Sequence, residues 1–104
     1  MIDWTQLDDL QEQLGSDGLL EIIDIFIEET APVIERLDPD SAGIGADLHF
    51  VKGGASNVGF KNLVRQCEIG EAQARAGTRV DPDPVRTSFA TSCKLVRDRY
   101  GITV

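Results

Sequence analysis

The sequence has little of what would mark a membrane or disulfide-stabilised protein. Its longest strictly aliphatic or aromatic runs have three residues, as in residues 25–27, whereas a membrane-spanning helix needs about 20 apolar residues. The first ten residues are acidic and lack a basic segment followed by an apolar stretch, so no secretory signal is expected. The only two cysteines, Cys67 and Cys93, match no metal or redox spacing. We expect a cytoplasmic protein with no membrane contact and two reduced, core-facing thiols, with a disulfide as the alternative.

Positive charge is scarce in the first part of the chain. Residues 1–40 hold 12 acidic groups and one basic group, whereas residues 41–104 hold 6 acidic and 9 basic groups. The acidic part would repel a phosphate backbone and the basic part lacks interleaved aromatic residues, so no nucleic-acid partner is expected. The asymmetry favours a partner with an acidic contact surface, unless the charges serve only solubility.

Helical periodicity dominates the 104 residues, which suffice for one domain with one core. Four stretches carry mostly apolar residues at alternating steps of three and four, which is typical of helices with one buried face. These stripes are Leu19, Ile23, Phe26, Thr30, Val33 and Leu37; Leu48, Val51, Ala55 and Val58; Phe60, Leu63, Cys67, Gly70 and Ala74; and Val85, Phe89, Ser92, Val96 and Tyr100. No strand pattern competes with them.

Capping and turn residues predict where the helices begin and end. Asp3 and Gln6 indicate a capping box for a short first helix that ends at Gly15, and Pro32 indicates a kink in the helix that follows. The other boundary signals are the break at residues 38–45, Gly59, Gly77, Asp83 with Pro84, and Gly101. The sequence therefore predicts a single all-α domain over residues 1–104, an antiparallel four-helix bundle with a short additional N-terminal helix.

The only histidine lies in an unusual segment of the third stretch. Glycine inside a helix costs about 1 kcal/mol relative to alanine, so the pair Gly53 and Gly54 needs a reason. His49, Lys52 and Ser56 each follow a stripe residue by one position, which places them on the outward side of the predicted helix. Gly53 is the i+4 neighbour of His49 and leaves a bare patch beside the imidazole.

These residue types suit phosphoryl transfer, which needs mainly positioning and charge stabilisation. A neutral imidazole offers a lone pair for attack, while Lys52 would disfavour a positive charge on the ring and attract phosphoryl oxygens. Gly53 would let the active site of a second protein approach. From the residues alone, an inert surface histidine stays an alternative. One histidine and two distant cysteines serve a metal site poorly, and the adjacent Asp47 projects about 100° from His49, which disfavours hydrolase chemistry.

The segment from His49 to Gly77 resembles the signature of histidine-containing phosphotransfer (HPt) domains. The matching residues are His49, Val51, Lys52, Gly53, Val58, Gly59, Leu63, Cys67, Glu71 and Gly77. The order of helices is similar to the family across nearly the whole chain. The resemblance implies a four-helix bundle that takes a phosphoryl group from an aspartyl phosphate on one receiver domain and passes it to another.

The resemblance also implies roles for individual residues. His49 would be the phosphoacceptor through its ring nitrogen Nε2, Lys52 would contact phosphoryl oxygens, and Gly53 would leave the docking face open. Glu71 would hold the other ring nitrogen with help from Arg75, and the outward-facing Ser56 completes the candidate site.

Three residues depart from the family pattern. Leu48 stands where alanine is common, which predicts bulkier local packing. Gly54 replaces a usual serine, which predicts a more flexible helix. Gly70 replaces a common leucine, which indicates either a closer approach of two helices or a small cavity.

We therefore expect a monomeric phosphotransfer intermediate of a bacterial two-component phosphorelay. It would be a carrier rather than an enzyme, because the chain has no ATP-binding glycine loop and no room for a kinase domain. Its partners would be response-regulator receiver domains or a hybrid histidine kinase. It would hold no cofactor or metal of its own, and Mg²⁺ would be bound by the receiver. The alternative is a non-catalytic helical adaptor that binds receivers or other signalling proteins; a small-molecule enzyme would lack a second catalytic group.

Overall fold

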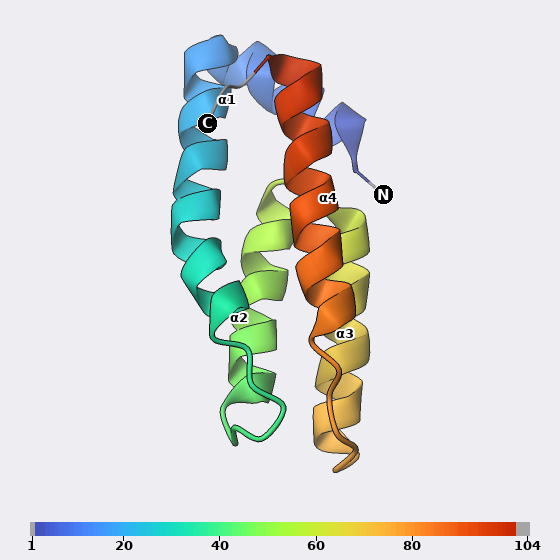
Figure 1. Ribbon diagram of the computed structural model, residues 1–104. Helices are drawn as coiled ribbons and strands as arrows, with labels where there is room; N and C mark the ends of the chain where they lie inside the picture. Colours follow the sequence, from blue (N-terminus) through green and yellow to red (C-terminus); the bar gives the residue numbers. More distant parts are fainter. Residues whose placement is uncertain (1, 102–104) are drawn as a thin grey trace.

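The computed structural model describes residues 2–101, most of which lie in four helices (Figure 1). The helices are α1 (Trp4–Glu35), α2 (Ile44–Asn57), α3 (Lys61–Arg75) and α4 (Asp83–Tyr100). Within the described residues, the only β-type pairing is an isolated antiparallel bridge between Ile2 and Phe60. The prediction of an all-helical protein, a bundle with four main helices, is confirmed.

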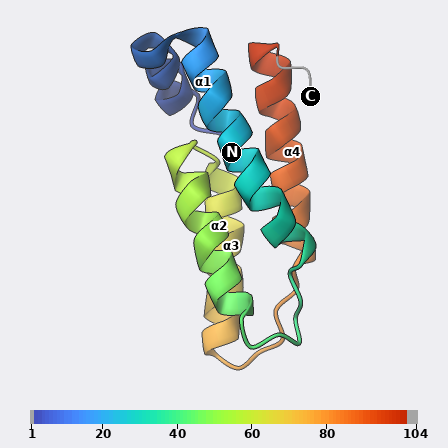
Figure 2. The same ribbon diagram turned by 90° about the vertical axis from the view of Figure 1, so that its left-hand side faces the viewer.

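The chain direction reverses from each helix to the next in the view of Figure 1. Helices α2 and α3 form a hairpin and pack together more closely than any other pair. The first part of α1 and the last part of α4 extend beyond the turn of this hairpin, which gives an elongated molecule of 44 × 23 × 18 Å (Figures 1 and 2). No helix within residues 2–101 is long and apolar enough to cross a membrane.

The four stripes predicted from the sequence form the core. Every residue of the first two stripes is buried, and so are most residues of the third and fourth; Ala74, Phe89 and Tyr100 are partly exposed. At the centre, the rings of Phe26 and Phe60 meet edge to face with their centroids 5.1 Å apart. The spacing of apolar residues thus identified the buried face of each helix.

Helix α1 includes the segment predicted as a separate short helix. Gly15 has non-helical backbone angles, φ 76° and ψ 171°, and the first turns lie at an angle to the rest of α1 (Figure 2). The segment is therefore not confirmed as an element of its own, because α1 runs from Trp4 to Glu35 across this bend. As predicted, Pro32 does not divide the helix, but the non-helical angles inside α1 occur at Gly15 and not at Pro32.

The start of the chain fastens the turn between α2 and α3. Asp3 accepts a hydrogen bond from the backbone N–H of Gln6 at 3.1 Å, which is one half of the predicted capping box. The Gln6 side chain does not complete the box. Its amide donates instead to the carbonyl oxygens of Ser56 (3.0 Å) and Asn57 (3.2 Å) at the end of α2. The Asp3 N–H also donates to the carbonyl of Gly59 at 2.7 Å, so residues 2–6 hold the hairpin turn in place.

Both cysteines are free and buried, as predicted. Burial raises the pKa of Cys67 to about 12, and the neighbouring carboxylate of Glu71 adds to this effect. Burial also raises the pKa of Cys93 to about 11. The two side chains therefore remain protonated thiols at neutral pH and contribute as small apolar groups in the core.

Candidate functional site

His49 stands on the outer surface of α2. The preceding residue, Leu48, is fully buried against α3, and the rotation of one residue turns the imidazole away from the core. The His49 side chain is 72% exposed. The outward position predicted for His49 is therefore confirmed, and a protein partner can reach its ring.

Glu71 approaches the imidazole from α3. Its Oε2 lies 3.4 Å from Nδ1 of His49, and its side chain is only 11% exposed. An ionised carboxylate only accepts hydrogen bonds, so Nδ1 carries the proton in this contact. The neutral ring then keeps its lone pair on Nε2, the nitrogen on the side away from Glu71.

Lys52 is paired with the same carboxylate. Its Nζ lies 2.9 Å from Oε1 of Glu71, and its side chain is 27% exposed. The sequence predicted an ammonium group on the outward face, one turn from His49, and assigned it no partner. The structure differs, because the long side chain turns towards α3 and its charge meets Glu71 instead of standing alone in solvent.

The shared carboxylate is charged at neutral pH. Burial by itself raises the pKa of Glu71, but the hydrogen bonds and positive charges of Lys52 and His49 outweigh burial and hold the pKa below its usual value. The site is therefore a short chain of alternating groups: a cation, a carboxylate and an imidazole, supplied by two helices.

The two glycines that follow Lys52 have different reasons to be glycine. A Cβ atom added to Gly53 would meet no atom within 4 Å, so this position faces open space beside His49. A Cβ atom added to Gly54 would lie 3.0 Å from the ring of Phe26 on α1. Gly53 keeps the surface low, as predicted. Gly54 allows α1 to approach α2 closely, a packing role that the sequence reasoning did not predict.

The other two departures from the family pattern, Leu48 and Gly70, explain how Glu71 reaches His49. Leu48 on α2 packs directly onto Gly70 on α3, and a Cβ atom at Gly70 would lie 2.8 Å from Leu48 Cδ1. Of the two predicted explanations for Gly70, the structure has the closer approach of helices, with the larger leucine side chain filling the space. His49 and Glu71 each follow a member of this pair by one position, so the tight contact brings them together.

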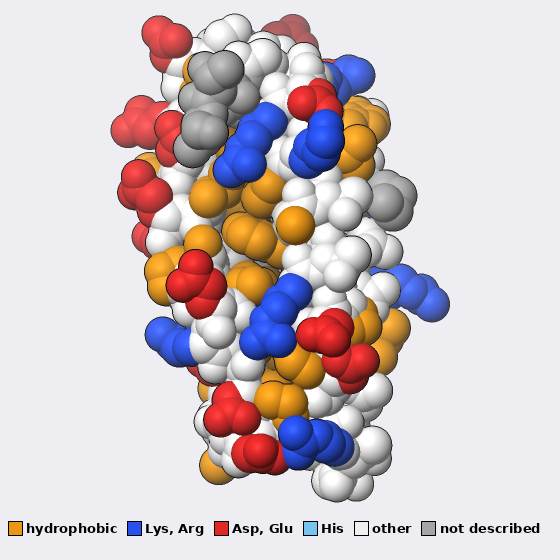
Figure 3. All heavy atoms as spheres, viewed as in Figure 1, with side chains coloured by type: hydrophobic (Ala, Val, Ile, Leu, Met, Phe, Trp, Pro, Cys, Tyr) orange, Lys and Arg blue, Asp and Glu red, His pale blue; other side chains and the backbone are white. Residues whose placement is uncertain are grey.

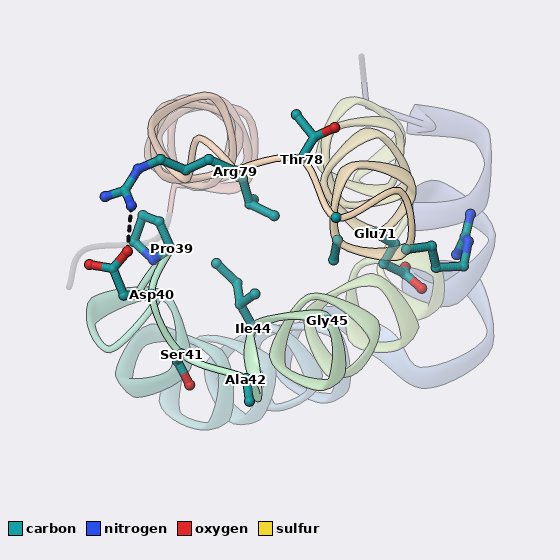
Figure 4. Close-up of a pocket in the computed structure, with 13 residues that line it drawn as sticks. Pro39, Asp40, Ser41, Ala42, Ile44, Gly45, Glu71, Thr78 and Arg79 are labelled. Carbon is teal, nitrogen blue, oxygen red and sulfur yellow. Dashed lines mark hydrogen bonds and ion pairs between the residues drawn. The ribbon is translucent and has the colours of Figure 1, made fainter.

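Two of the predicted supporting residues lie outside this cluster. Arg75 is exposed and, among residues 2–101, makes no ion pair or hydrogen bond with His49 or Glu71. It lines a hollow of about 600 Å³ between residues 39–45 and 71–80, at whose edge Glu71 lies (Figure 4). Ser56 is exposed two turns after His49, and its contact with Gln6 uses its backbone carbonyl.

The structure adds an apolar side chain that the sequence reasoning did not assign to the site. Phe50 follows His49 and is 50% exposed. The sequence could have indicated this, because Phe50 is a large aromatic residue that does not belong to the buried stripe of α2. Asp47 instead pairs with Arg36, the residue that follows α1, at 3.1 Å, consistent with the prediction that it is badly placed to orient His49.

Other parts of the surface have a different character. The face formed by α1 and α4 shows acidic side chains along α1 and no visible histidine (Figure 3). Within residues 2–101, no three His, Cys, Asp or Glu side chains gather in a way that could hold a metal ion.

A known family model matches most of the chain. The model of the Hpt domain matches residues 21–98, three quarters of the chain, and this range includes His49, Lys52, Gly53 and Glu71. No curated protein and no solved structure matches the chain. The chain belongs to the Hpt domain family.

Proposed function

We propose that this chain is a histidine phosphotransfer intermediate of a two-component phosphorelay and that His49 is its phosphoacceptor. Hpt domains have a histidine phosphotransfer role in phosphorelays generally. The observation that carries the proposal for this chain is the exposed ring of His49, whose Nδ1 is engaged by Glu71. This contact leaves the nucleophilic lone pair on Nε2, where a partner can reach it.

In the proposed reaction, His49 takes the phosphoryl group from an aspartyl phosphate of one receiver domain and passes it to the aspartate of another. Gly53 provides the clearance that the receiver needs to bring its phosphoryl group in line with Nε2. Lys52 contacts phosphoryl oxygens from its position beside Glu71. Arg75 contributes positive charge at the edge of the contact surface.

The remaining features follow from this carrier role. The chain acts as a cytoplasmic, monomeric single domain, an antiparallel bundle whose α1 begins with a short angled segment. It does not use ATP and holds no cofactor of its own. Mg²⁺ is bound by the acidic pocket of the receiver partner, which is a response regulator or a hybrid histidine kinase.

A non-catalytic adaptor is the second candidate function, and the half-exposed Phe50 favours it. An apolar side chain beside the bare Gly53 suits the docking of a protein whether or not a phosphoryl group moves. Such an adaptor would not need His49.

The first prediction is tested with a ³²P-labelled receiver. We expect label on this chain that is stable in alkali and labile in acid, and we expect the His49→Gln variant to take none. Because His49 is the only histidine in the sequence, phosphohistidine chemistry can arise at no other residue.

The control is receiver binding by the His49→Gln variant, measured by calorimetry after circular dichroism has shown that it is folded. A His49→Gln variant that binds the receiver but takes no label would show that the loss of label is due to the missing imidazole and not to misfolding. Label that persists in the variant would place the chemistry elsewhere. A wild-type protein that binds receivers but never takes label would favour the adaptor.

A further inference from the structure

We propose that the negative charge of Glu71 sets how readily phosphorylated His49 gives up its phosphoryl group, by keeping a proton on Nδ1, and that Lys52 limits this effect. This inference rests on the proposed function. It concerns charge rather than orientation: a neutral amide could orient the ring equally well, whereas only a carboxylate also stabilises a cation.

The electron and proton balance of the transfer shows why that proton matters. The Nε2 lone pair attacks phosphorus, a P–N bond forms, and the P–O bond to the donor aspartate breaks with its electron pair on the departing carboxylate. The ring is then a phosphoimidazolium cation that still carries the proton on Nδ1. In the next transfer the attacking aspartate forms a P–O bond, and the P–N electron pair returns to a neutral imidazole. No proton is gained or lost.

Loss of the Nδ1 proton would interrupt this cycle. The phosphorylated ring would then be neutral, and breaking its P–N bond would expel an imidazolate anion, a much poorer leaving group than imidazole. Glu71 opposes that loss, because its Oε2 accepts the Nδ1 hydrogen bond at 3.4 Å and its charge stabilises the cation. Phosphorylated His49 is therefore held in its reactive form.

Lys52 acts on the same carboxylate in the opposite direction. Its ammonium group, 2.9 Å from Oε1, takes up part of the negative charge that would otherwise act on the ring. Along α3, the charged residues about one turn from Glu71 are Glu68 and Arg75. Among residues 2–101, no charged side chain of α1 or α4 pairs with His49, Lys52 or Glu71. The balance between Glu71 and Lys52 thus determines the lifetime of the phosphoryl group.

The second prediction uses phosphoramidate, a small chemical donor that requires no receiver. The full chain is phosphorylated at His49, and loss of the phosphohistidine signal is followed by ³¹P NMR between pH 5 and 9. The rate of phosphohistidine loss should fall as the pH rises, because the Nδ1 proton is lost. In the Glu71→Gln variant, which keeps a hydrogen-bond acceptor but loses the charge, we expect this fall to occur about one pH unit lower. At pH 8 the phosphoryl group should then survive about tenfold longer than in the wild type, since one pKa unit corresponds to a factor of ten.

Two further variants complete the test. Glu68→Gln removes the same charge from an exposed position on α3 and should behave as the wild type does. Lys52→Gln removes the ammonium group that offsets the charge of Glu71, so the fall in the rate of phosphohistidine loss should move to higher pH. Superimposable profiles for the wild type and Glu71→Gln would overturn the inference while leaving the proposed function intact, and so would a Glu71→Gln variant that takes no phosphoryl group. A wild-type protein that phosphoramidate cannot label would overturn both.

Discussion

At the residue scale, the site depends on one carboxylate that serves two partners. Glu71 binds Nδ1 of His49 with one oxygen and the ammonium group of Lys52 with the other. In the proposed transfer, a phosphoryl group at Nε2 would bring a second anion within reach of Lys52 and would compete with Glu71 for that cation. Lys52 is therefore positioned to respond to phosphorylation, which a lysine free in solvent would do less specifically.

The third prediction compares the two neighbouring glycines of α2. Gly53→Ala should raise the free energy of unfolding by up to about 1 kcal/mol, because alanine favours the helix and its Cβ meets open space. Gly54→Ala should lack this gain or destabilise the protein, because its Cβ would press on the ring of Phe26 at 3.0 Å. Urea unfolding measures both.

The same positions separate stability from function. Gly53→Leu should remain folded and accept phosphoryl groups from phosphoramidate, yet take them from a receiver at least about tenfold more slowly, because the added side chain obstructs docking. Receiver transfer at the wild-type rate would contradict the assigned clearance role of Gly53.

Residue placement along one helix could be predicted, whereas contacts between helices could not. The position of His49 one step after a buried leucine was sufficient to turn it outward. The pairing of Lys52 with Glu71 depends on how α2 and α3 cross and on the length of a flexible side chain, neither of which appears in the spacing of residues. For the same reason, the spacing of residues does not predict the contact between Gly54 and Phe26.

At the element scale, the packing of α2 on α3 determines the geometry of the site. The pattern common in the family has alanine and leucine at the positions of Leu48 and Gly70. Here the larger residue is on α2 and the smaller one on α3, and the two side chains fill one another's space. From the sequence, Leu48 predicted bulkier packing and Gly70 a closer helix approach or a small cavity; in the structure the two residues form a complementary pair next to His49 and Glu71.

The fourth prediction tests this complementarity with a double-mutant cycle. Leu48→Ala should lower the free energy of unfolding by about 2–5 kcal/mol, because it opens a cavity over Gly70. Gly70→Ala should lower it by about 1–3 kcal/mol, because its Cβ would lie 2.8 Å from Leu48 Cδ1.

In the double variant, the new methyl group occupies space that Leu48 vacated. The total loss should therefore be smaller than the sum of the single losses by about 1 kcal/mol or more in urea unfolding. Strict additivity would show that the two residues do not share one packing site.

Element boundaries were predictable to the extent that local chemistry determines them. The apolar stripes located the helices, and Asp83 with Pro84 correctly marked the start of α4. The first helix was harder, because its bend at Gly15 leaves helical residues on both sides. Gln6 was expected to cap its own helix and caps α2 instead, since the carbonyl groups at the end of α2 lie within its reach.

At the scale of the whole molecule, charge is divided along the chain: residues 1–40 hold 12 acidic groups and one basic group, and residues 41–104 hold 6 acidic and 9 basic groups. Acidic side chains line α1 in Figure 3, and Lys and Arg side chains stand on the same face. His49 belongs to the more basic second part of the chain. A receiver with an acidic contact surface would be attracted to the phosphoacceptor side and repelled by α1. We therefore expect this charge distribution to steer an acidic receiver towards the His49 side.

The fifth prediction is that transfer from such a receiver slows as ionic strength rises, by about tenfold or more between low and high salt. Stopped-flow measurement at several salt concentrations gives the rates. Phosphorylation by phosphoramidate serves as the control, because a small donor has no extended surface to be attracted.

A matched pair of charge variants locates the effect. Arg75→Gln should reduce the salt dependence, whereas Lys94→Gln, a removal of one positive charge on α4, should leave it nearly unchanged. Transfer rates that do not change with salt concentration would contradict electrostatic steering towards the His49 side. So would equal effects of the two variants on the salt dependence.

The contact between the start of the chain and the α2–α3 turn has a consequence for dissecting the protein. All the residues of the reactive cluster belong to one hairpin, so a peptide of α2 and α3 would contain the complete chemistry. It would nevertheless lack Gln6 and Asp3, which tie down the turn, and Phe26, which rests on Gly54. Such an excised hairpin should lose its alignment and with it the pairing of imidazole and carboxylate, because the smallest working unit is the intact fold.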